Sequence, residues 1–322
     1  MRVFVTGASG FIGSAVVPEL LNAGHAVVGL ARSDRSAAAL TAAGAEVHRG
    51  DLDDLTGLRR AAATADGVIH LAFKHELAFS GDMQGAADAD RRAIETFAKA
   101  LAGSDRPLLI ASGLAGLTPG RVSTEQDGHG LAQPGAAHGS ALAAQIRGLQ
   151  TRMENAELVL SFASHGIRSS IVRIAPSCHG RGDHHGFVPR LIGVARAKRV
   201  SGYVGDGSNA WPAVHLLDAA RLFRLALEKA PAGSTLHAVA DEGVQVRDIA
   251  RVIGRHLDVP VAAISAEDAR EHFGAMAAFV AIDGMASSTQ TQELLSWKPV
   301  EHGLIADLEQ GHYFELAEPA AA

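Results

Sequence analysis

Short apolar runs alternate with amphipathic stretches through about residue 175. An apolar run of about four to eight residues indicates a buried strand, and apolar residues repeated every three or four positions indicate a helix. The pattern predicts strands over residues 3–5, 26–31, 46–49, 67–72, 107–112, 167–174 and 236–239. It predicts helices over residues 12–24, 36–43, 53–63, 90–102, 141–164, 187–198 and 219–229. Strands and helices that alternate in this way form a doubly wound parallel sheet, so the predicted fold class is α/β of the Rossmann type.

The alternation becomes less regular after residue 175. At 322 residues the chain is long for one compact core, which favours a large domain that carries a smaller lobe. We expect residues 1–175, continued by about 216–240, to form the doubly wound domain. Residues 176–215 and 241–322 are expected to form the smaller lobe, which would cover a substrate.

A glycine-rich turn, Thr6-Gly7-Ala8-Ser9-Gly10-Phe11-Ile12-Gly13, joins the first predicted strand to the first predicted helix. Gly7 can adopt the positive φ of a tight turn, Gly10 lets a pyrophosphate approach the backbone, and Gly13 lets the helix pack against its strand. Free N–H groups and the dipole at the start of such a helix bind phosphate. Because this turn lies between a strand and a helix, it predicts a dinucleotide site rather than a purely structural turn.

Residues at the ends of the next strands are the other candidates for contact with a dinucleotide. Arg32 and Ser33 follow the second strand, where an arginine can pair with the 2′-phosphate of NADP and an acidic residue would bind the ribose of NAD. We therefore expect NADP(H) rather than NAD(H). Along the same sheet edge, the further expected contacts are Asp51, Leu52, Leu71, Ala72 and Phe73. A helix cap is the alternative role of Asp51.

Composition and charge argue against several classes of protein. The net charge of −6 gives no basic surface for nucleic acid or for an anionic membrane. No apolar run approaches the about 20 residues of a membrane-spanning helix. Cys178 is the single cysteine, which excludes an internal disulfide and favours a reducing compartment. We expect a soluble cytoplasmic protein that acts on a small-molecule substrate.

Six segments together resemble the extended short-chain dehydrogenases/reductases, which are the NAD(P)-dependent epimerase/dehydratase-like proteins. They are the TGxxGxxG turn at Thr6–Gly13, Asp51-Leu52, His70-Leu71-Ala72, Ser112, Trp211-Pro212-Ala213-Val214-His215 with Asp218, and Leu295-Ser296-Trp297-Lys298-Pro299. The resemblance spans almost the whole chain. It implies a nicotinamide cofactor, a serine that binds the reacting oxygen, and a segment at 211–215 that joins the lobes. It also favours a homodimer, and Asp218 is expected to cap the helix that follows it.

One motif of that family is missing. Its members carry YxxxK on the helix after the fifth strand, where the tyrosine is the acid/base and the lysine holds the nicotinamide ribose. This chain has only Tyr203 and Tyr313, and neither is followed by lysine four residues on. Counting back from residues 165–168 places Gly148 at the tyrosine position and Arg152 at the lysine position. The resemblance is therefore to an atypical member, in which the glycine cannot transfer a proton and the arginine can still bind a ribose.

Histidines are the candidate substitutes, because a histidine transfers protons near neutral pH. Those expected near the crevice are His75, His138, His179, His184 and His185. His179 and Lys74 are the leading candidates for the missing acid. His179, His184 and His185 offer metal ligands together with Asp183. Their spacing matches no compact zinc pattern, so no metal is expected. Cys178 has no base next to it and is expected to be a small buried residue rather than a nucleophile.

These residues favour an NADP(H)-dependent oxidoreductase that transfers a hydride between nicotinamide and a carbonyl or alcohol of a small organic substrate. Ser112 would orient the reacting oxygen, and Arg152 would bind the ribose. One alternative is a non-catalytic NADP-binding redox sensor or scaffold, which the missing tyrosine favours. Another is an epimerase or dehydratase that acts on a sugar nucleotide, which ordinarily needs that tyrosine. The fold alone does not decide among them.

Overall fold

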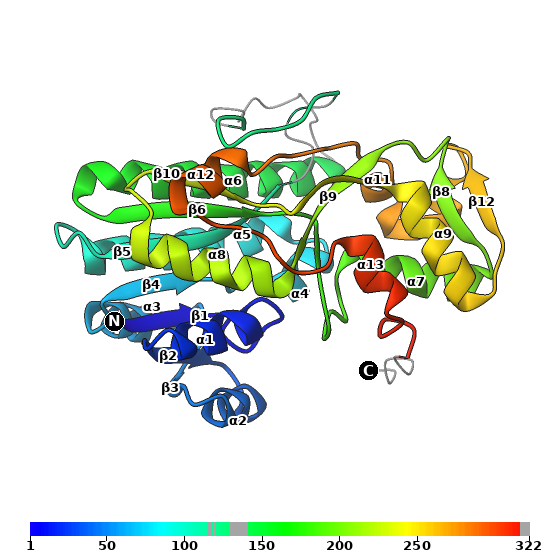
Figure 1. The fold of residues 1–322 in the computed structure, drawn as a ribbon. Coiled ribbons are helices and arrows are strands. Elements are labelled where there is room, and N and C mark those ends of the chain that lie inside the picture. The colour runs from blue at the N-terminus through cyan, green and yellow to red at the C-terminus, as the bar shows by residue number, and fades with distance from the viewer. Residues whose placement is uncertain (115–117, 119, 129–140, 316–322) are drawn as a thin grey trace.

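The fold has two lobes, a large one built on a parallel sheet and a smaller one built mainly from the C-terminal part of the chain (Figure 1). The computed structural model describes residues 1–114, 118, 120–128 and 141–315. Seven strands form the central sheet in the order β10-β6-β5-β4-β1-β2-β3, and all neighbouring pairs are parallel. They are β1 (Arg2–Thr6), β2 (Ala26–Ala31), β3 (Glu46–Arg49), β4 (Gly67–His70), β5 (Pro107–Gly113), β6 (Arg168–Ile174) and β10 (Ser234–Ala238). The predicted Rossmann-type α/β class is confirmed.

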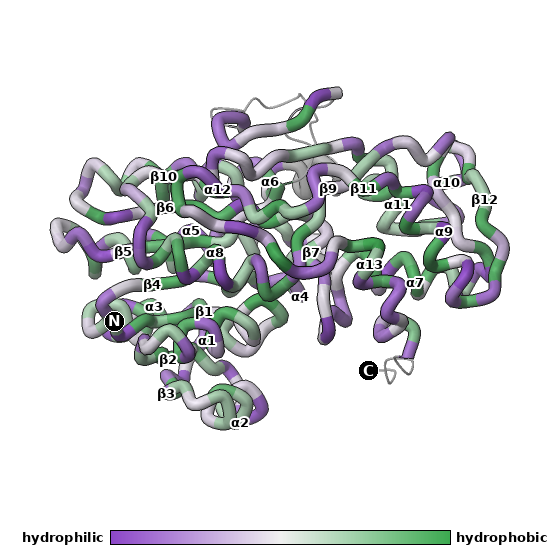
Figure 2. The backbone as a smooth tube through the Cα atoms, viewed as in Figure 1, coloured by the Kyte–Doolittle hydropathy of each residue, from purple (hydrophilic) through white to green (hydrophobic). Residues whose placement is uncertain are grey.

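Helices cover both faces of this sheet. One face is covered by α1 (Gly13–Asn22), α2 (Asp34–Ala42), α8 (Leu216–Lys229) and α12 (Thr289–Leu295). The other is covered by α3 (Leu55–Ala63), α5 (Met83–Leu101) and α6 (Ala141–Ser161), which a short 3₁₀ turn (Phe162–His165) follows. Figure 2 shows that apolar residues concentrate in the strands between these layers, as expected for a sheet buried on both faces.

The strand order reverses beside β1. The chain runs outward from β1 through β2 to β3 and then returns to β4 on the other side of β1. Dinucleotides bind in the crevice that such a reversal opens at the carboxyl ends of the strands. The residues that follow β1, β2, β4 and β5 therefore border the crevice, and the short helix α4 (His75–Phe79) lies in the connection after β4.

The smaller lobe contains two small sheets and several short helices. Its elements are β7 (Ser177–His179), α7 (Phe187–Lys198), β8 (Ser201–Val204), β9 (Ala210–His215), β11 (Asp241–Gln245), α9 (Val246–Leu257), β12 (Val261–Ile264), α10 (Ala269–Phe273), a 3₁₀ turn (Gly274–Met276), α11 (Ala277–Val280) and α13 (Leu304–Glu309). The order of one sheet is β11-β9-β7, and β8 pairs with β12 in the other. Trp211 and Tyr313 are buried in the core of this lobe.

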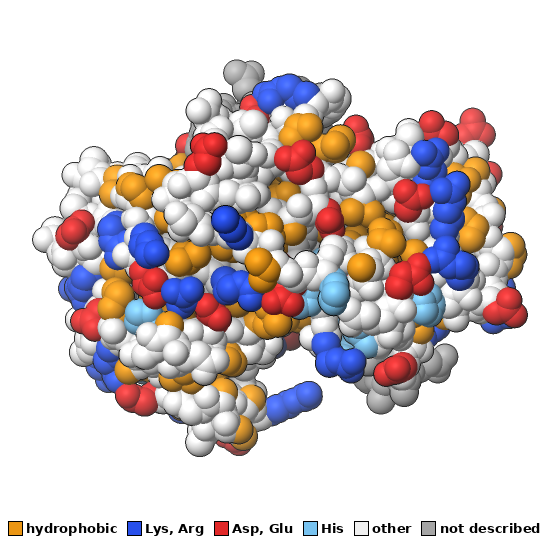
Figure 3. Space-filling view, viewed as in Figure 1, with side chains coloured by type: hydrophobic (Ala, Val, Ile, Leu, Met, Phe, Trp, Pro, Cys, Tyr) orange, Lys and Arg blue, Asp and Glu red, His pale blue; other side chains and the backbone are white. Residues whose placement is uncertain are grey.

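Helix α9 shows how an amphipathic pattern places an element of this lobe. Val246, Ile249 and Ile253 are buried and pack into the core. Arg247, Arg251 and Arg255 recur every four residues, and Figure 3 shows basic side chains in a row along this helix. Each of these arginines interacts with an acidic or amide side chain; for example, Arg251 Nη1 donates a hydrogen bond to Asp248 Oδ1 (2.7 Å).

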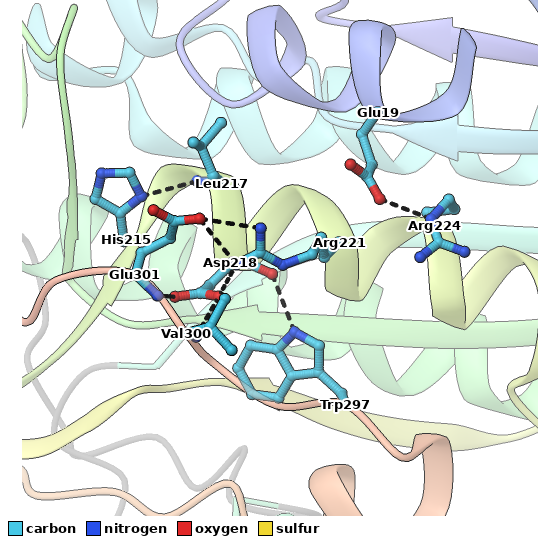
Figure 4. Close-up of polar contacts among 9 residues, drawn as sticks. All are labelled: Glu19, His215, Leu217, Asp218, Arg221, Arg224, Trp297, Val300 and Glu301. Carbon is cyan, nitrogen blue, oxygen red and sulfur yellow. Dashed lines mark hydrogen bonds and ion pairs between the residues drawn. The ribbon is translucent and has the colours of Figure 1, made fainter. Parts of the chain in front are cut away.

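A buried carboxylate fastens the C-terminal segment to the large lobe (Figure 4). Asp218 is fully buried, and its two oxygens accept hydrogen bonds from the backbone N–H groups of Val300 (2.9 Å) and Glu301 (3.0 Å). Arg221 forms an ion pair with the same carboxylate, and the indole N–H of Trp297 donates to the Asp218 carbonyl (3.1 Å). The prediction that Asp218 caps α8 is wrong, because this helix begins at Leu216 and its first residues precede Asp218.

The C-terminal segment also departs from the expected lobe boundaries. We expected residues 241–322 to belong to the smaller lobe, but α12 packs against β10 and α8. Leu295 and Trp297 are part of the core of the large lobe. Among the described residues, no helix has both the length and the apolar character needed to cross a membrane.

Candidate cofactor and active site

The glycine turn is packed so tightly that side chains would not fit at two of its glycines. Gly7 has φ +66°, and a Cβ there would lie 2.7 Å from the backbone nitrogen of Ala72. A Cβ on Gly13 would lie 2.2 Å from the Gly7 carbonyl oxygen. The turn from β1 into α1 is therefore packed against itself and against the residues that follow β4.

The rim of this turn is open toward the crevice. Ser9 and Gly10 are exposed, whereas Phe11 and Ile12 are half-buried. No side chain among the described residues caps the start of α1 at Ile12. The N–H groups of Ser14 and Ala15 already donate to the Gly10 (2.8 Å) and Ile12 (3.1 Å) carbonyls, so a pyrophosphate would be bound by the N–H groups of residues 11–13. The arrangement thus fits the pyrophosphate of a dinucleotide.

The adenosine side of the crevice is bordered by the ends of β2 and β3. Ser33 caps α2, because its hydroxyl accepts a hydrogen bond from Ser36 N (3.2 Å). Asp51 is exposed, and its Oδ1 accepts from the N–H groups of Asp53 (2.8 Å) and Asp54 (3.2 Å). Asp51 therefore shapes the turn before α3, although the cap of that helix is Asp54. Leu52 is buried in the core beneath this turn.

Arg32 forms a bidentate ion pair across the crevice. Its two terminal nitrogens lie 2.7 and 3.3 Å from the carboxylate oxygens of Glu76, the second residue of α4. Arg32 follows β2, and α4 follows β4, so the pair bridges the two neighbours of β1. Glu76 raises the pKa of Arg32 through this hydrogen bond and its charge. Both side chains are exposed, so solvent screens the pair and it contributes little to stability.

Lys74 lies on the wrong side of the crevice for the role of catalytic acid. Its ammonium group is 2.5 Å from Asp53 Oδ2, in the turn after β3. The hydrogen bond from Lys74 lowers the pKa of Asp53. The structure therefore contradicts the prediction that Lys74 replaces the tyrosine, because the side chain points toward the adenosine half.

Ser112 and Arg152 lie at the opposite half of the crevice. Ser112 is at the end of β5, in register with Arg173 of β6, and its side chain is half-buried. The guanidinium of Arg152, on α6, lies 3.8 Å from the centre of the Phe73 ring, just after β4. Leu71, Ala72 and Phe73 are all half-buried at this strand end. Burial lowers the pKa of Arg152, while the negative charge of Asp90 raises it.

A buried polar chain that the sequence did not reveal supports this end of the crevice. Thr6 Oγ1 lies 2.6 Å from His70 Nδ1 and accepts a hydrogen bond from Ala72 N (3.2 Å). His70 Nε2 lies 3.1 Å from Asp90, whose other oxygen accepts from Asn155 Nδ2 (2.9 Å). Burial would raise the pKa of Asp90, but these hydrogen bonds and the nearby charges hold it below its usual value.

The chain leaves no room for a tyrosine at position 148. A Cβ on Gly148 would lie 2.5 Å from Met83 Cγ and 2.6 Å from Gln84 N, at the start of α5. Neither tyrosine of the chain replaces it. Tyr313 is buried in the smaller lobe, where its oxygen accepts from Gly180 N (2.9 Å), and Tyr203 lies on β8.

His179 is placed inside the protein rather than in the crevice. Its side chain is fully buried, and its Nδ1 lies 2.9 Å from Asp307 on α13. The prediction that His179 donates a proton to the substrate is therefore wrong. Cys178, expected to be buried, is half-buried, and desolvation raises the pKa of its thiol. In the parts of the chain that the structure describes, no three His, Cys, Asp or Glu side chains form a metal site.

Of the other histidines, His75 remains beside the crevice. Its ring is 5.1 Å from that of Phe73, on whose face Arg152 lies. Desolvation lowers the pKa of His75, and the charges of Arg152 and Arg190 lower it further. His184 and His185 are exposed in the loop before α7, and His138 lies outside the described residues.

Comparisons with known proteins agree with this architecture. The sequence profile of the NAD dependent epimerase/dehydratase family matches residues 3–99. An uncharacterized protein of Schizosaccharomyces pombe is 47% identical over 98% of this chain and 100% of its own length. A 4-hydroxy-2-methyl-3-oxo-4-farnesyl-3,4-dihydroquinoline-1-oxide ketoreductase of Stigmatella aurantiaca is 27% identical over 77% of this chain and 70% of its own.

A dTDP-glucose 4,6-dehydratase of Streptomyces venezuelae, solved with NAD bound, has the same fold. The two structures superpose with a TM-score of 0.71, covering 98% of this chain and 97% of the dehydratase, at 19% sequence identity. At that identity the likeness concerns the fold. The family profile, which matches the glycine turn and the strands that follow it, identifies the group: the protein belongs to the NAD-dependent epimerase/dehydratase family, the extended short-chain dehydrogenases/reductases.

Proposed function

We propose that the protein is an NADP(H)-dependent reductase of carbonyl compounds that works without the tyrosine of its family. The observation that carries this proposal is that Arg152 and His75 both lie against the Phe73 ring just after β4, and that the neighbouring strand β5 ends at Ser112 and Gly113. The glycine turn opens into the same crevice beside them. A relative named as a ketoreductase supports the reaction class.

Each residue has a separate task in this proposal. The N–H groups after Gly10 hold the pyrophosphate, and Arg152 binds the nicotinamide ribose from α6. Ser112 donates a hydrogen bond to the carbonyl oxygen of the substrate, which polarises the bond. The reduced nicotinamide, when bound, supplies the hydride that the carbonyl carbon accepts. His75 gives its proton to the oxygen, so one carbonyl becomes one alcohol and the ring is left neutral.

Arg32 is the proposed contact for the 2′-phosphate of NADP. Replacing Arg32 with alanine should weaken NADPH binding about tenfold and leave NADH binding unchanged, because one charge-assisted pair is lost. Glu76→Gln should strengthen NADPH binding about threefold, because Arg32 then no longer has to break its ion pair with Glu76 to bind the 2′-phosphate. The dissociation constants are measured from the fluorescence of the bound reduced cofactor. An unchanged NADPH:NADH ratio in Arg32→Ala would refute the assignment.

The proton transfer predicts a pH dependence. The pKa of His75 is lowered, so its proton is present only below that pKa. The rate of carbonyl reduction should therefore fall as the pH rises through the pKa of His75, and the rate of alcohol oxidation should rise, because oxidation needs the neutral ring to accept a proton. In His75→Ala the pH dependence of both rates should disappear. The rate of reduction at low pH should fall only about tenfold, because water can partly replace the acid. Rates from about pH 5 to 8 test this. His184→Ala, also exposed, is the control.

The direct test is turnover. Purified protein is mixed with NADPH, or with NADH, and with a panel of ketones, aldehydes and quinones, while the absorbance of the reduced nicotinamide is followed. Oxidation of NADPH with formation of the alcohol supports the proposal. If NADPH binds but no carbonyl or alcohol in the panel turns over in either direction, the proposal fails in favour of a cofactor-binding sensor or scaffold.

A further inference from the structure

One histidine lies at a junction between the two lobes. Strand β9 of the smaller lobe ends at His215, and helix α8 of the large lobe begins at the next residue, Leu216. The His215 side chain is half-buried, and its imidazole lies at the start of α8 (Figure 4). A change in the charge of this imidazole therefore acts on the junction itself.

His215 caps α8 in a way that only an unprotonated ring nitrogen allows. Its Nδ1 accepts a hydrogen bond from the backbone N–H of Leu217 (3.2 Å), one of the first N–H groups of the helix. Because an accepting nitrogen carries no proton, the single proton of the neutral ring is on Nε2. A second proton would turn Nδ1 into a donor and so remove the cap. It would also place a positive charge at the positive end of the helix dipole.

A second imidazole packs against the first. The ring of His179, at the end of β7, is 5.3 Å from that of His215, at an interplanar angle of 78°. His179 is fully buried, and its Nδ1 lies 2.9 Å from Asp307 Oδ2. Two imidazolium groups at this separation repel each other, so a proton on either ring opposes a proton on the other.

The carboxylates that face the two rings are already paired with other groups. Asp307 of α13 is paired with the second imidazole. Asp218 of α8 and Glu301, which lies between α12 and α13, both pair with Arg221 (Figure 4). Among the described residues, these three carboxylates are the negative charges that favour a proton on the capping ring. Each already compensates another group, so none is available to that ring alone.

We propose that His215 is an acid-sensitive cap, whose protonation loosens the junction between β9 and α8. In the closed junction, desolvation lowers the pKa of His215, His179 lowers it further, and the three carboxylates only partly oppose this. The open junction leaves the imidazole near its usual pKa of about 6.5 and takes up a proton first. Opening should therefore become more favourable as the pH falls below about 6.5, by up to tenfold per pH unit for one proton.

Hydrogen exchange measures this opening without substrate or cofactor. The protection factors of the amides in residues 216–223, in the first half of α8, are compared at about pH 7.5 and about pH 5.5, after correction for the intrinsic pH dependence of exchange. In the unaltered protein they should fall about fivefold or more at the lower pH. Those of residues 55–63 in α3, on the other face of the sheet, should stay constant. An equal fall in α3 would indicate acid unfolding of the whole chain and would overturn the proposal.

An asparagine at position 215 separates the charge of the cap from its hydrogen bond. The side-chain oxygen of asparagine caps helices and does not titrate in this range. In His215→Asn the protection of α8 should therefore be the same at both pH values, and in His215→Ala it should be low at both. His256→Asn changes an exposed histidine of α9 and should keep the response of the unaltered protein. A fall in His215→Asn as large as in the unaltered protein would contradict the proposal, and so would constant protection in the unaltered protein.

Discussion

Replacing Asp218 with alanine should lower the free energy of unfolding by about 3 to 5 kcal/mol. The carboxylate is fully buried, and it accepts the backbone N–H groups of Val300 and Glu301. Removing it leaves two donors without acceptors and Arg221 without its buried partner. Because these contacts hold the C-terminal segment on α8, we expect the segment after Trp297 to detach first.

The measurement is urea unfolding followed by tryptophan fluorescence, together with the melting temperature. Asp218→Asn keeps the shape of the side chain but only one acceptor oxygen, so it should lose most of the same stability. Glu19→Gln is a matched control, because Glu19 pairs with Arg224 on the same helix but is partly exposed. It should cost about 1 kcal/mol or less. A loss below about 1 kcal/mol in Asp218→Ala would refute the importance of this anchor.

The large lobe was predictable because its strands and helices are long and regularly patterned. Strand β2 has the bounds predicted over 26–31, and in the smaller lobe helix α7 has those predicted over 187–198. Both are set by local apolar periodicity, which tertiary contacts do not override. The short strands β7 and β8 were not predicted, because the regular alternation of strands and helices that locates the similarly short β3 ends before residue 177.

The positions of site residues could be predicted where a motif fixes the backbone conformation. They could not be predicted where the contact of a long side chain depends on the tertiary fold. The positive φ predicted for Gly7 is confirmed, and Gly13 is closely packed, since sterics decide both. Lys74 was placed correctly after β4, yet its side chain reaches Asp53 rather than the reaction centre. His179 was expected in an open loop, but it lies on β7 facing Asp307, which is distant in sequence. Such pairings depend on the tertiary fold.

The buried chain from Thr6 to Asn155 illustrates the same limit. Thr6 and His70 are the last residues of β1 and β4 and pair in register, so their proximity follows from the parallel arrangement of these strands. The contribution of Asp90 could not be predicted, because an aspartate on an amphipathic helix is usually exposed. Only the packing of α5 and α6 on the sheet brings Asp90 and Asn155 to His70.

Replacing Gly13 with alanine should abolish detectable binding of both NADPH and NADH, with an affinity loss of more than about 100-fold. The added Cβ would overlap the Gly7 carbonyl, which is backbone and cannot rotate away. The start of α1 must then move from the end of β1, and the N–H groups proposed to hold the pyrophosphate move with it. The same displacement should cost about 1 to 3 kcal/mol of stability. Cofactor titration and thermal unfolding measure the two effects separately.

Gly193→Ala supplies the matched control for that substitution. Gly193 is exposed within α7, and a Cβ there meets nothing within 4 Å. Alanine should therefore stabilise the protein by about 0.5 to 1 kcal/mol through helix propensity and leave cofactor binding unchanged. The two glycines differ in what surrounds them rather than in their chemistry. If Gly13→Ala still binds NADPH as tightly as Gly193→Ala does, the pyrophosphate does not lie on the start of α1, and the proposed cofactor site is wrong.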